Sequence, residues 1–407
     1  MIKKIKEILK SLGPGFITAA LVLGPGSITV ASRIGSEHGY AFLWVIVLAA
    51  FFMITYTSMA LRFGVYNDKS ILQSIADNYG RWFAMVIGIS AFLSTSSFQF
   101  GNNLGIGLGM QGITGIDERV WPMIFSPLGI VLIFWAKNLY KVLEKLMMFM
   151  VIIMILAFLF NIFLTKPNVG EVAKGFLPLS FSLENMDVLA ALMGTTFSLA
   201  GAMYQSYLVQ NKHWKISNLK RGQLDTYTGI FFLALISALV IITSAAVLHP
   251  FGIKVNSAAD MALQLEAIFG NYAKIIFSLG LCAAAFSSLV VNAVLGGGLL
   301  ADGFGLGRTM DEKVPKLFTT LILLTGMLVA VLFRGNVIYA LIIAQASSIL
   351  AVPLIALGMF LTANNKKVMG TYKNNTFQNV LAVSGFVVIS IMVYFMYSKL
   401  IDFVGSL

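Results

Sequence analysis

The sequence predicts an all-α membrane protein that crosses a bilayer many times. Of its 407 residues, 58% are hydrophobic and only 11% are charged, a balance that no soluble domain of this length needs. The apolar residues form repeated runs of about twenty residues, the length of a transmembrane helix. These observations predict a single transmembrane domain over residues 1–407, with the lipid bilayer as its surroundings.

Eleven spans are expected, and short polar or basic segments connect them. A further amphipathic helix is expected outside the membrane at residues 257–269, before the eighth span. The spans run over about 14–34, 41–62, 82–112, 121–136, 140–164, 187–210, 226–248, 272–300, 317–333, 337–361 and 378–402.

The positive charges indicate how the chain is oriented. The net charge is +11, and with the N-terminus inside, twenty of the 28 Lys and Arg residues fall in cytoplasmic segments. This asymmetry is the positive-inside pattern of a membrane protein, so the basic excess does not predict a nucleic-acid partner. The first ten residues, MIKKIKEILK, are expected to be a cytoplasmic anchor rather than a targeting peptide. The expected location is the plasma (inner) membrane.

Other classes of site are not expected. The single cysteine, Cys282, lies inside a span, so a disulfide framework and a thiol metal cluster are excluded. His38, His213 and His249 all fall at or beyond the ends of spans. Since no nucleophile–base set occurs within a span, an enzyme is not expected, and no resident cofactor is predicted. The sequence leaves the oligomeric state open, and a monomer is a sufficient form.

The first span is interrupted near its middle by Gly24-Pro25-Gly26-Ser27. Proline removes a helical donor and clashes with the preceding turn. The peptide groups freed there cannot be satisfied by hydrocarbon, so they must face protein or a wet cavity. A kinked packing helix is one interpretation. The other is a discontinuous helix of the kind that carries a transporter's substrate site.

The sixth span contains a second candidate break, a run of small and β-branched residues from Gly194 to Ala202. Spans one and six each open a group of five, so paired breaks point to an inverted repeat with the site between the halves. The repeats are expected at about 14–164 and 187–361, with an extra helix at about 378–402. The predicted substrate-binding residues are Gly24, Gly26, Ser27, Thr195, Ser198, Gly201 and Gln345.

Several motifs resemble the NRAMP metal-ion transporter family over most of the chain. The match runs without gaps through the first and sixth spans. The resemblance implies a LeuT-type fold of two inverted five-helix repeats plus an eleventh helix, working by alternating access. The matching residues are Gly13-Pro14-Gly15-Phe16, Gly39-Tyr40, Leu43-Trp44, Tyr207 through Gln210, Asp225-Thr226, Ser287-Ser288, Asp302-Gly303-Phe304, and Gln345 through Pro353.

The departures from the family concern its metal site. The family's Asp-Pro-Gly-Asn motif, whose carboxylate and amide bind the metal, is replaced by Gly24-Pro25-Gly26-Ser27. Its Met-Pro-His becomes Ser198-Leu199-Ala200, and a second histidine becomes Gln205. Acidic positions of the family's proton route fall at Thr95 and Phe98, and only Gln345 of the tenth-helix site is retained. Met193 and Met203 flank the second break and are expected to fill the core.

Two cargoes remain open. Without a carboxylate, imidazole or thioether, the site is not expected to hold Mn²⁺ or Fe²⁺ as the family does. A neutral, glycine-lined break favours a small polar organic solute such as an amino acid, since Gly24 and Gly26 leave room for it. The alternative is a divalent cation such as Mg²⁺ or Mn²⁺, partly hydrated and held by Ser27, Ser198, Gln345 and backbone carbonyls. A non-transporting sensor built on the same fold is a third, less favoured interpretation.

The groups needed for coupling also differ. The spans lack the central acidic residues and histidines of a proton relay. Na⁺ is therefore the candidate coupling ion, with Ser287 and Ser288 in the eighth span as its predicted hydroxyl ligands. Arg33 is a cation added in the outer half of the first span. It is expected to pair with Glu37, and it would repel cations if it faces the entrance.

Overall fold

The computed structural model describes residues 13–22, 24–135, 156–179, 185–309 and 311–405, and the secondary structure of these residues is entirely helical. Eight helical segments among them are long and apolar enough to cross a membrane, and two further apolar helices are shorter. An all-α membrane protein is therefore confirmed. The first ten residues and the part of the fifth span at 140–155 lie outside the described residues.

The helices are bounded as follows: α2 Pro14–Val22, α3 Pro25–His38, α4 Leu43–Tyr66, α5 Ile71–Tyr79, α6 Arg81–Thr114, α7 Pro122–Trp135, α9 Val169–Gly175, α10 Met186–Thr196, α11 Leu199–Asn211, α12 Leu219–Val247, α13 Ala258–Ala262, α14 Glu266–Phe269, α15 Ala273–Phe304, α16 Lys313–Leu332, α17 Val337–Ser347, α18 Val352–Asn364, α19 Lys366–Met369 and α20 Thr376–Gly405. A shorter apolar helix spans Leu156–Thr165.

Both expected interruptions are present. The first span divides into α2 and α3, with Gly24 extended (φ −106°, ψ −176°) and Pro25 opening α3, where its missing N–H costs nothing. The sixth span divides into α10 and α11, with Phe197 and Ser198 between them. Ser198 is also extended, at φ −87° and ψ 100°.

Other boundaries differ from those predicted. The seventh span was expected from residue 226, whereas α12 begins at Leu219. Its first two turns carry Lys220, Arg221 and Asp225, which a search for apolar runs leaves out. The tenth span is not continuous, because the 3-10 turn Ser348–Ala351 separates α17 from α18. Helices α5, α9 and α19 were not expected, while helix at 257–269 is confirmed by α13 and α14.

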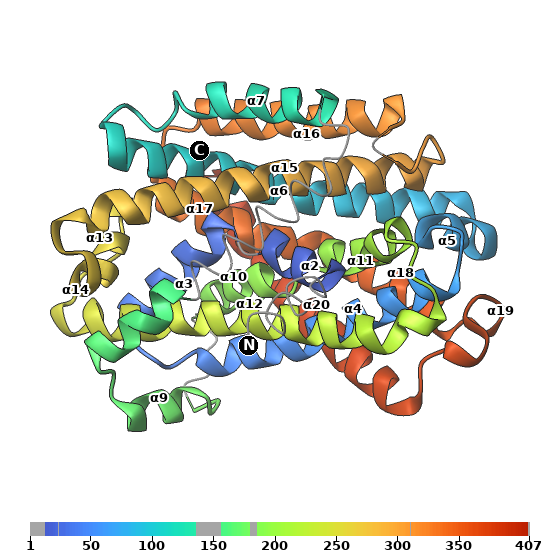
Figure 1. Cartoon of the computed structure of the whole chain (residues 1–407), viewed down its shortest axis with the longest axis horizontal. Coiled ribbons are helices and arrows are strands. Elements are labelled where there is room, and N and C mark those ends of the chain that lie inside the picture. The colour runs from blue at the N-terminus through green and yellow to red at the C-terminus, as the bar shows by residue number, and fades with distance from the viewer. Residues whose placement is uncertain (1–12, 23, 136–155, 180–184, 310, 406–407) are drawn as a thin grey trace, which may run out of the picture.

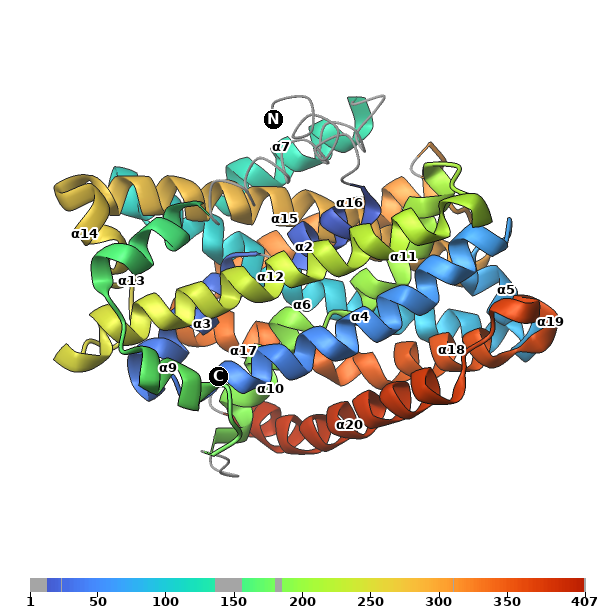
Figure 2. The same ribbon diagram turned by 60° about the horizontal axis from the view of Figure 1, so that its bottom comes forward.

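The half-helices of the two interrupted spans, α2, α3, α10 and α11, lie in the middle of the bundle (Figure 1). On one side α6 packs along α15, and α16 contacts both of them and α7. On the other side α12 packs against α2 and α3, while α4 packs against α11 and α12. Helix α17 touches α3, α6 and α10, so it joins the two sides. Figure 2 shows α20 running along the face made by α4, α10 and α18.

The α6–α15 contact depends on glycine. A Cβ added at Gly109 of α6 would lie 2.7 Å from the carbonyl oxygen of Ser278 and 2.8 Å from the backbone nitrogen of Cys282, both on α15. These are backbone atoms, so no side-chain rotation relieves the clash. Gly280 of α15 has open space, with nothing within 4 Å of an added Cβ. The close approach of the two helices therefore requires glycine at residue 109 and not at residue 280.

We expect Gly109→Ala to lower stability by about 1–3 kcal/mol, because the added methyl group must push α6 and α15 apart. Gly280→Ala is the matched control, and helix propensity makes it neutral or stabilising by up to about 1 kcal/mol. The melting temperature of each purified variant in detergent measures the difference. Equal melting temperatures for the two variants would contradict this packing.

Candidate functional site

Ser27 connects the two helix breaks. Its hydroxyl donates to the carbonyl oxygen of Val22 at 2.9 Å and lies 3.5 Å from the carbonyl oxygen of Thr195. Val22 is the last residue of α2, and Thr195 lies in the last turn of α10, where helical carbonyls lack an intrahelical donor. The side chain of Ser27 is buried, at 3% exposure. One hydroxyl and two backbone carbonyls thus gather between the two breaks.

Thr195 and Ser198 are both at the second break, but their hydroxyls have structural roles. The Thr195 hydroxyl donates to the carbonyl of Leu192 at 2.8 Å, within its own helix. Thr195 therefore faces Ser27 through its carbonyl oxygen rather than its hydroxyl, and its place in a substrate site stays a prediction. Ser198 caps α11, since its hydroxyl accepts from the backbone N–H of Gly201 at 3.4 Å. That bond explains why Ser198 and Gly201 act together at the start of this half-helix.

Gln345 fills the space beside Gly26. A Cβ added at Gly26 would lie 2.1 Å from Nε2 of Gln345, and one added at Gly101 would lie 2.9 Å from the same nitrogen. Gln345 itself is 2% exposed. The expectation that Gly26 leaves room for a larger substrate is wrong for this conformation, because a side chain from α17 occupies that room. Sequence spacing could not show that α17 crosses at this point.

Gly24 faces a second group of polar atoms. Its Cβ position lies 3.0 Å from the hydroxyl oxygen of Ser288 on α15 and 3.2 Å from Oδ1 of Asn102 on α6. Asn292 donates to the Ser288 hydroxyl at 2.9 Å. Ser287 is also buried, but among the described residues its hydroxyl has no hydrogen-bond partner. Of the two predicted coupling serines, Ser288 is the one placed against the first break.

Two site residues were missed by the sequence analysis. Asn102 is a buried amide in an apolar helix, a signal that points to function by itself. Ser348 donates to the carbonyl of Gln345 at 2.6 Å and opens the 3-10 turn that follows α17. The signal for that turn is Pro353, which cannot continue the hydrogen-bonding of the preceding helix.

The remaining residues at the family's metal-site and proton-route positions, and the methionines beside the second break, bond or pack within the protein. Gln205 makes a hydrogen bond with Thr18 of α2 at 2.7 Å and with Thr226 of α12 at 3.2 Å. Thr95 donates to the carbonyl of Ala91 in its own helix. Met193 and Met203 are fully buried in the main hydrophobic cluster, as expected. No group of three His, Cys, Asp or Glu residues that could hold a metal occurs in the described part of the chain.

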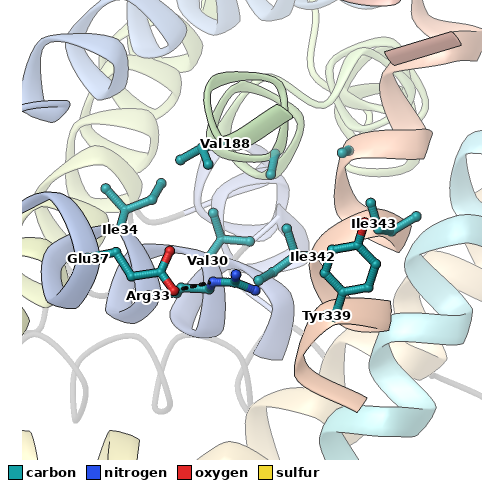
Figure 3. A pocket seen from close by; sticks show the side chains of 10 residues that line it. Val30, Arg33, Ile34, Glu37, Val188, Tyr339, Ile342 and Ile343 are labelled. Atoms are coloured by element: carbon teal, nitrogen blue, oxygen red, sulfur yellow. Dashed lines mark hydrogen bonds and ion pairs between the residues drawn. The ribbon is translucent and has the colours of Figure 1, made fainter. Parts of the chain in front are cut away.

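A pocket leads toward the site from the C-terminal end of α3 (Figure 3). Val30 lies one turn beyond Ser27, Ala191 lies one turn before Thr195, and Ala346 is next to Gln345, so the pocket ends beside the candidate site. We call this pocket the vestibule. Its lining comes from α3, α10 and α17 and consists of Val30, Arg33, Ile34, Glu37, Val188, Ala191, Tyr339, Ile342, Ile343 and Ala346.

The opposite end of the bundle is held by polar contacts. Both carboxylate oxygens of Asp225 accept from α2, one from Gly13 N–H and the other from Gly15 N–H, each at 2.7 Å. Tyr207 of α11 donates to Asp302 of α15 at 2.5 Å. These bonds fasten α2 to α12 and α11 to α15. The structure therefore combines a vestibule at the Arg33 end with a packed Asp302 end.

We expect Gly26→Ala to be destabilised and to regain stability when Gln345→Ala is added, because the alanine methyl group and the amide compete for the same space. The melting temperatures of the wild type, both single variants and the double variant form a double-mutant cycle, and contacting residues couple by about 0.5–3 kcal/mol. Gly280→Ala with Gln345→Ala is the control pair. Additive effects of Gly26→Ala and Gln345→Ala on the melting temperature would show that the Gln345 amide does not occupy the space beside Gly26.

Comparison with known proteins shows which family of sequences this chain resembles. The family model described as "Natural resistance-associated macrophage protein-like" matches residues 15–398. The chain is 22% identical to the divalent metal cation transporter MntH of Staphylococcus haemolyticus, over 95% of this chain and 91% of that protein. It is 24% identical to the MntH of Nostoc sp., over 93% of this chain and 88% of that protein.

Solved structures show the same fold. The crystal structure of the Eremococcus coleocola manganese transporter has a TM-score of 0.81 at 17% identity, covering 95% of this chain and 86% of that one. MhsT, solved in complex with L-phenylalanine, has a TM-score of 0.63 at 18% identity and covers 94% of this chain and 97% of that one. The LeuT-type fold, with two inverted five-helix repeats and an eleventh helix, is thereby confirmed. The chain belongs to the NRAMP family of membrane transporters.

Proposed function

We propose that this protein is a secondary transporter that carries a hard divalent cation, Mg²⁺ or Mn²⁺, by alternating access through the site between the two helix breaks. The cation keeps part of its hydration shell in the site. This proposal adopts the cargo that the sequence analysis held as the alternative.

The oxygen atoms around Ser27 carry the proposal. The hydroxyl of Ser27 and the carbonyls of Val22 and Thr195 come together where both helices stop. Hard cations prefer oxygen ligands, and Mg²⁺ in particular retains several waters rather than filling a cage of protein groups. Soft metals prefer sulfur and nitrogen ligands, whereas the buried thioethers of Met193 and Met203 pack in the hydrophobic cluster. Gln345 supplies a further oxygen if its amide turns.

An amino acid, the first cargo considered, is less well supported. The space beside Gly26 that such a solute needs is filled by Gln345. The sequence relatives are named as divalent metal cation transporters. The manganese transporter and the phenylalanine-bound neighbour, at 17% and 18% identity, support the fold alone. A small ion therefore fits this chain better than an organic solute.

We also propose how the chain is oriented in the membrane and where its two repeats lie. Basic residues gather at the Asp302 end, and contacts such as Arg81 to the Asp302 carbonyl and Lys215 to Asp68 hold their segments together. The positive-inside rule makes this end cytoplasmic and the vestibule external, in the plasma (inner) membrane. We assign the repeats to residues of about 14–164 and 187–361. The basic residues at this end include Arg62, Lys69, Arg81, Lys212, Lys215, Lys220, Arg221, Arg308, Lys313, Lys316, Lys366, Lys367 and Lys373.

Purified protein in liposomes is expected to take up Mn²⁺ or Mg²⁺, and Ser27→Ala is expected to reduce uptake about tenfold by removing one oxygen at the break. Ser36→Ala is the matched control on α3, because the Ser36 hydroxyl bonds within its own helix, to the carbonyl of Arg33. Uptake of radiolabelled alanine or phenylalanine without uptake of either metal would overturn the proposal. Equal metal uptake by the Ser27 and Ser36 variants would show that Ser27 is not part of the metal site.

We also propose Na⁺ as the coupling ion, with Ser288 beside Gly24 as its ligand. The same liposomes are expected to accumulate metal under an inward Na⁺ gradient and not under a pH gradient alone, because the hydrogen bonds of Ser27 and Gln345 run to backbone carbonyls and to the Ser348 hydroxyl rather than to acidic side chains. Ser288→Ala is expected to abolish the Na⁺ effect, whereas Ser90→Ala, with a hydroxyl bonded inside α6, keeps it. Uptake driven by the pH gradient would contradict this coupling.

A further inference from the structure

We infer that Arg33 is a specificity-determining residue of the vestibule and that its guanidinium group selects cargo by charge. The inference rests on the proposed function for the identity of the cargo and adds a filter in front of the site. Arg33 is set back by about two turns of α3 from Ser27, so it acts on the cargo before the oxygen ligands do.

The geometry of the ion pair leaves part of the arginine unused. Nε of Arg33 donates to Oε1 of Glu37 at 2.9 Å, one turn further along α3. The two side chains are 31% and 23% exposed. Among the described residues, neither terminal nitrogen of Arg33 donates to another group. Figure 3 shows the guanidinium lying between the Glu37 carboxylate and Ile342, so the positive end of the pair points across the vestibule toward α17.

The walls of the vestibule strengthen the effect of this charge. Apart from Arg33, Glu37 and the phenol ring of Tyr339, the lining side chains are aliphatic. Apolar walls with a low dielectric constant focus the field of a charge into the space between them. The positive end of the pair is therefore felt by any ion that passes from the mouth to Ala346 and Gln345.

The same pair contributes little to folding. A partly exposed i,i+4 pair typically stabilises a helix by only a few tenths of a kcal/mol, so replacing Arg33 with glutamine should leave the bundle intact. Its influence should appear in how cargo enters. A cation is repelled in proportion to its charge, so a divalent ion is slowed more than a monovalent one. An anionic or zwitterionic solute would instead gain a partner in the terminal nitrogens.

The test is metal uptake by liposomes containing the full chain at low ionic strength. Arg33→Gln is expected to lower KM for Mn²⁺ roughly threefold or more, with kcat unchanged, and Arg33→Lys is expected to keep the wild-type KM. Raising the salt concentration should remove the difference, since exposed charges are screened. Arg119→Gln is the matched control: Arg119 is paired with Asp117 at 2.7 Å in the α6–α7 loop, outside the vestibule lining. A KM that is unchanged or raised in Arg33→Gln would overturn the inference.

A second measurement needs no transported cargo. A cysteine introduced at Val188, a partly exposed residue of the vestibule wall, can be labelled with cationic and anionic methanethiosulfonate reagents. The wild-type chain corrects for Cys282, which is buried. Adding Arg33→Gln should raise the ratio of cationic to anionic labelling about threefold or more, and adding Arg119→Gln should not.

The two measurements separate this inference from the proposed function. A shifted labelling ratio in a protein that carries neither Mn²⁺ nor Mg²⁺ would remove the proposed cargo and keep the charge filter. Metal uptake with an unchanged labelling ratio and an unchanged KM would remove the filter and keep the cargo.

Discussion

Peptide groups released inside a membrane must find partners within the protein, because hydrocarbon offers none. Two helices of this bundle stop and restart, and the surrounding structure answers that requirement. The Ser27 hydroxyl reaches the carbonyl of Val22 across the first break, and Ser198 caps the start of α11 at the second. Helices α6, α15 and α17 close around both breaks. The polar atoms gathered around Ser27 are its hydroxyl and the carbonyl oxygens of Val22 and Thr195, which sets the chemistry proposed for the site.

The fold could be predicted from the sequence to a large extent, and the reasons are local. Pro25 between two glycines removes a helical donor in the middle of an apolar run, so an interruption between α2 and α3 was one of the two expected outcomes. Within the described residues, the apolar runs predicted most span ends to within a few residues. The early start of α12 was missed because its first turns carry the charged residues Lys220, Arg221 and Asp225. Arg221 lies over the Trp214 ring, and Asp225 accepts from Gly13 and Gly15. The turn before Pro353 was missed because the span was read from hydropathy alone.

The candidate site was predictable in its position but not in its detail. Ser27 and Gln345 lie where the paired breaks placed them. The orientation of the Thr195 hydroxyl, which turns into its own helix, depends on a side-chain rotation that no sequence pattern encodes. The contacts of Gly24 with Asn102 and Ser288 depend on how α6 and α15 approach the break. Local sequence determined where the helices stop, and tertiary packing determined which atoms meet there.

Gln345 has a consequence for how any ion reaches the centre of the molecule. The side-chain amide of Gln345 packs against two glycines on different helices, Gly26 on α3 and Gly101 on α6. Its backbone carbonyl oxygen lies against Gly194 on α10. A side chain confined in this way blocks the space between α3 and α6. If the proposed cation binds beside Gly26, it competes with this amide for the same space, so binding requires the amide to rotate. That rotation would change the contacts of the Gln345 side chain with Gly26 on α3 and Gly101 on α6, whereas the backbone contact with Gly194 on α10 would remain.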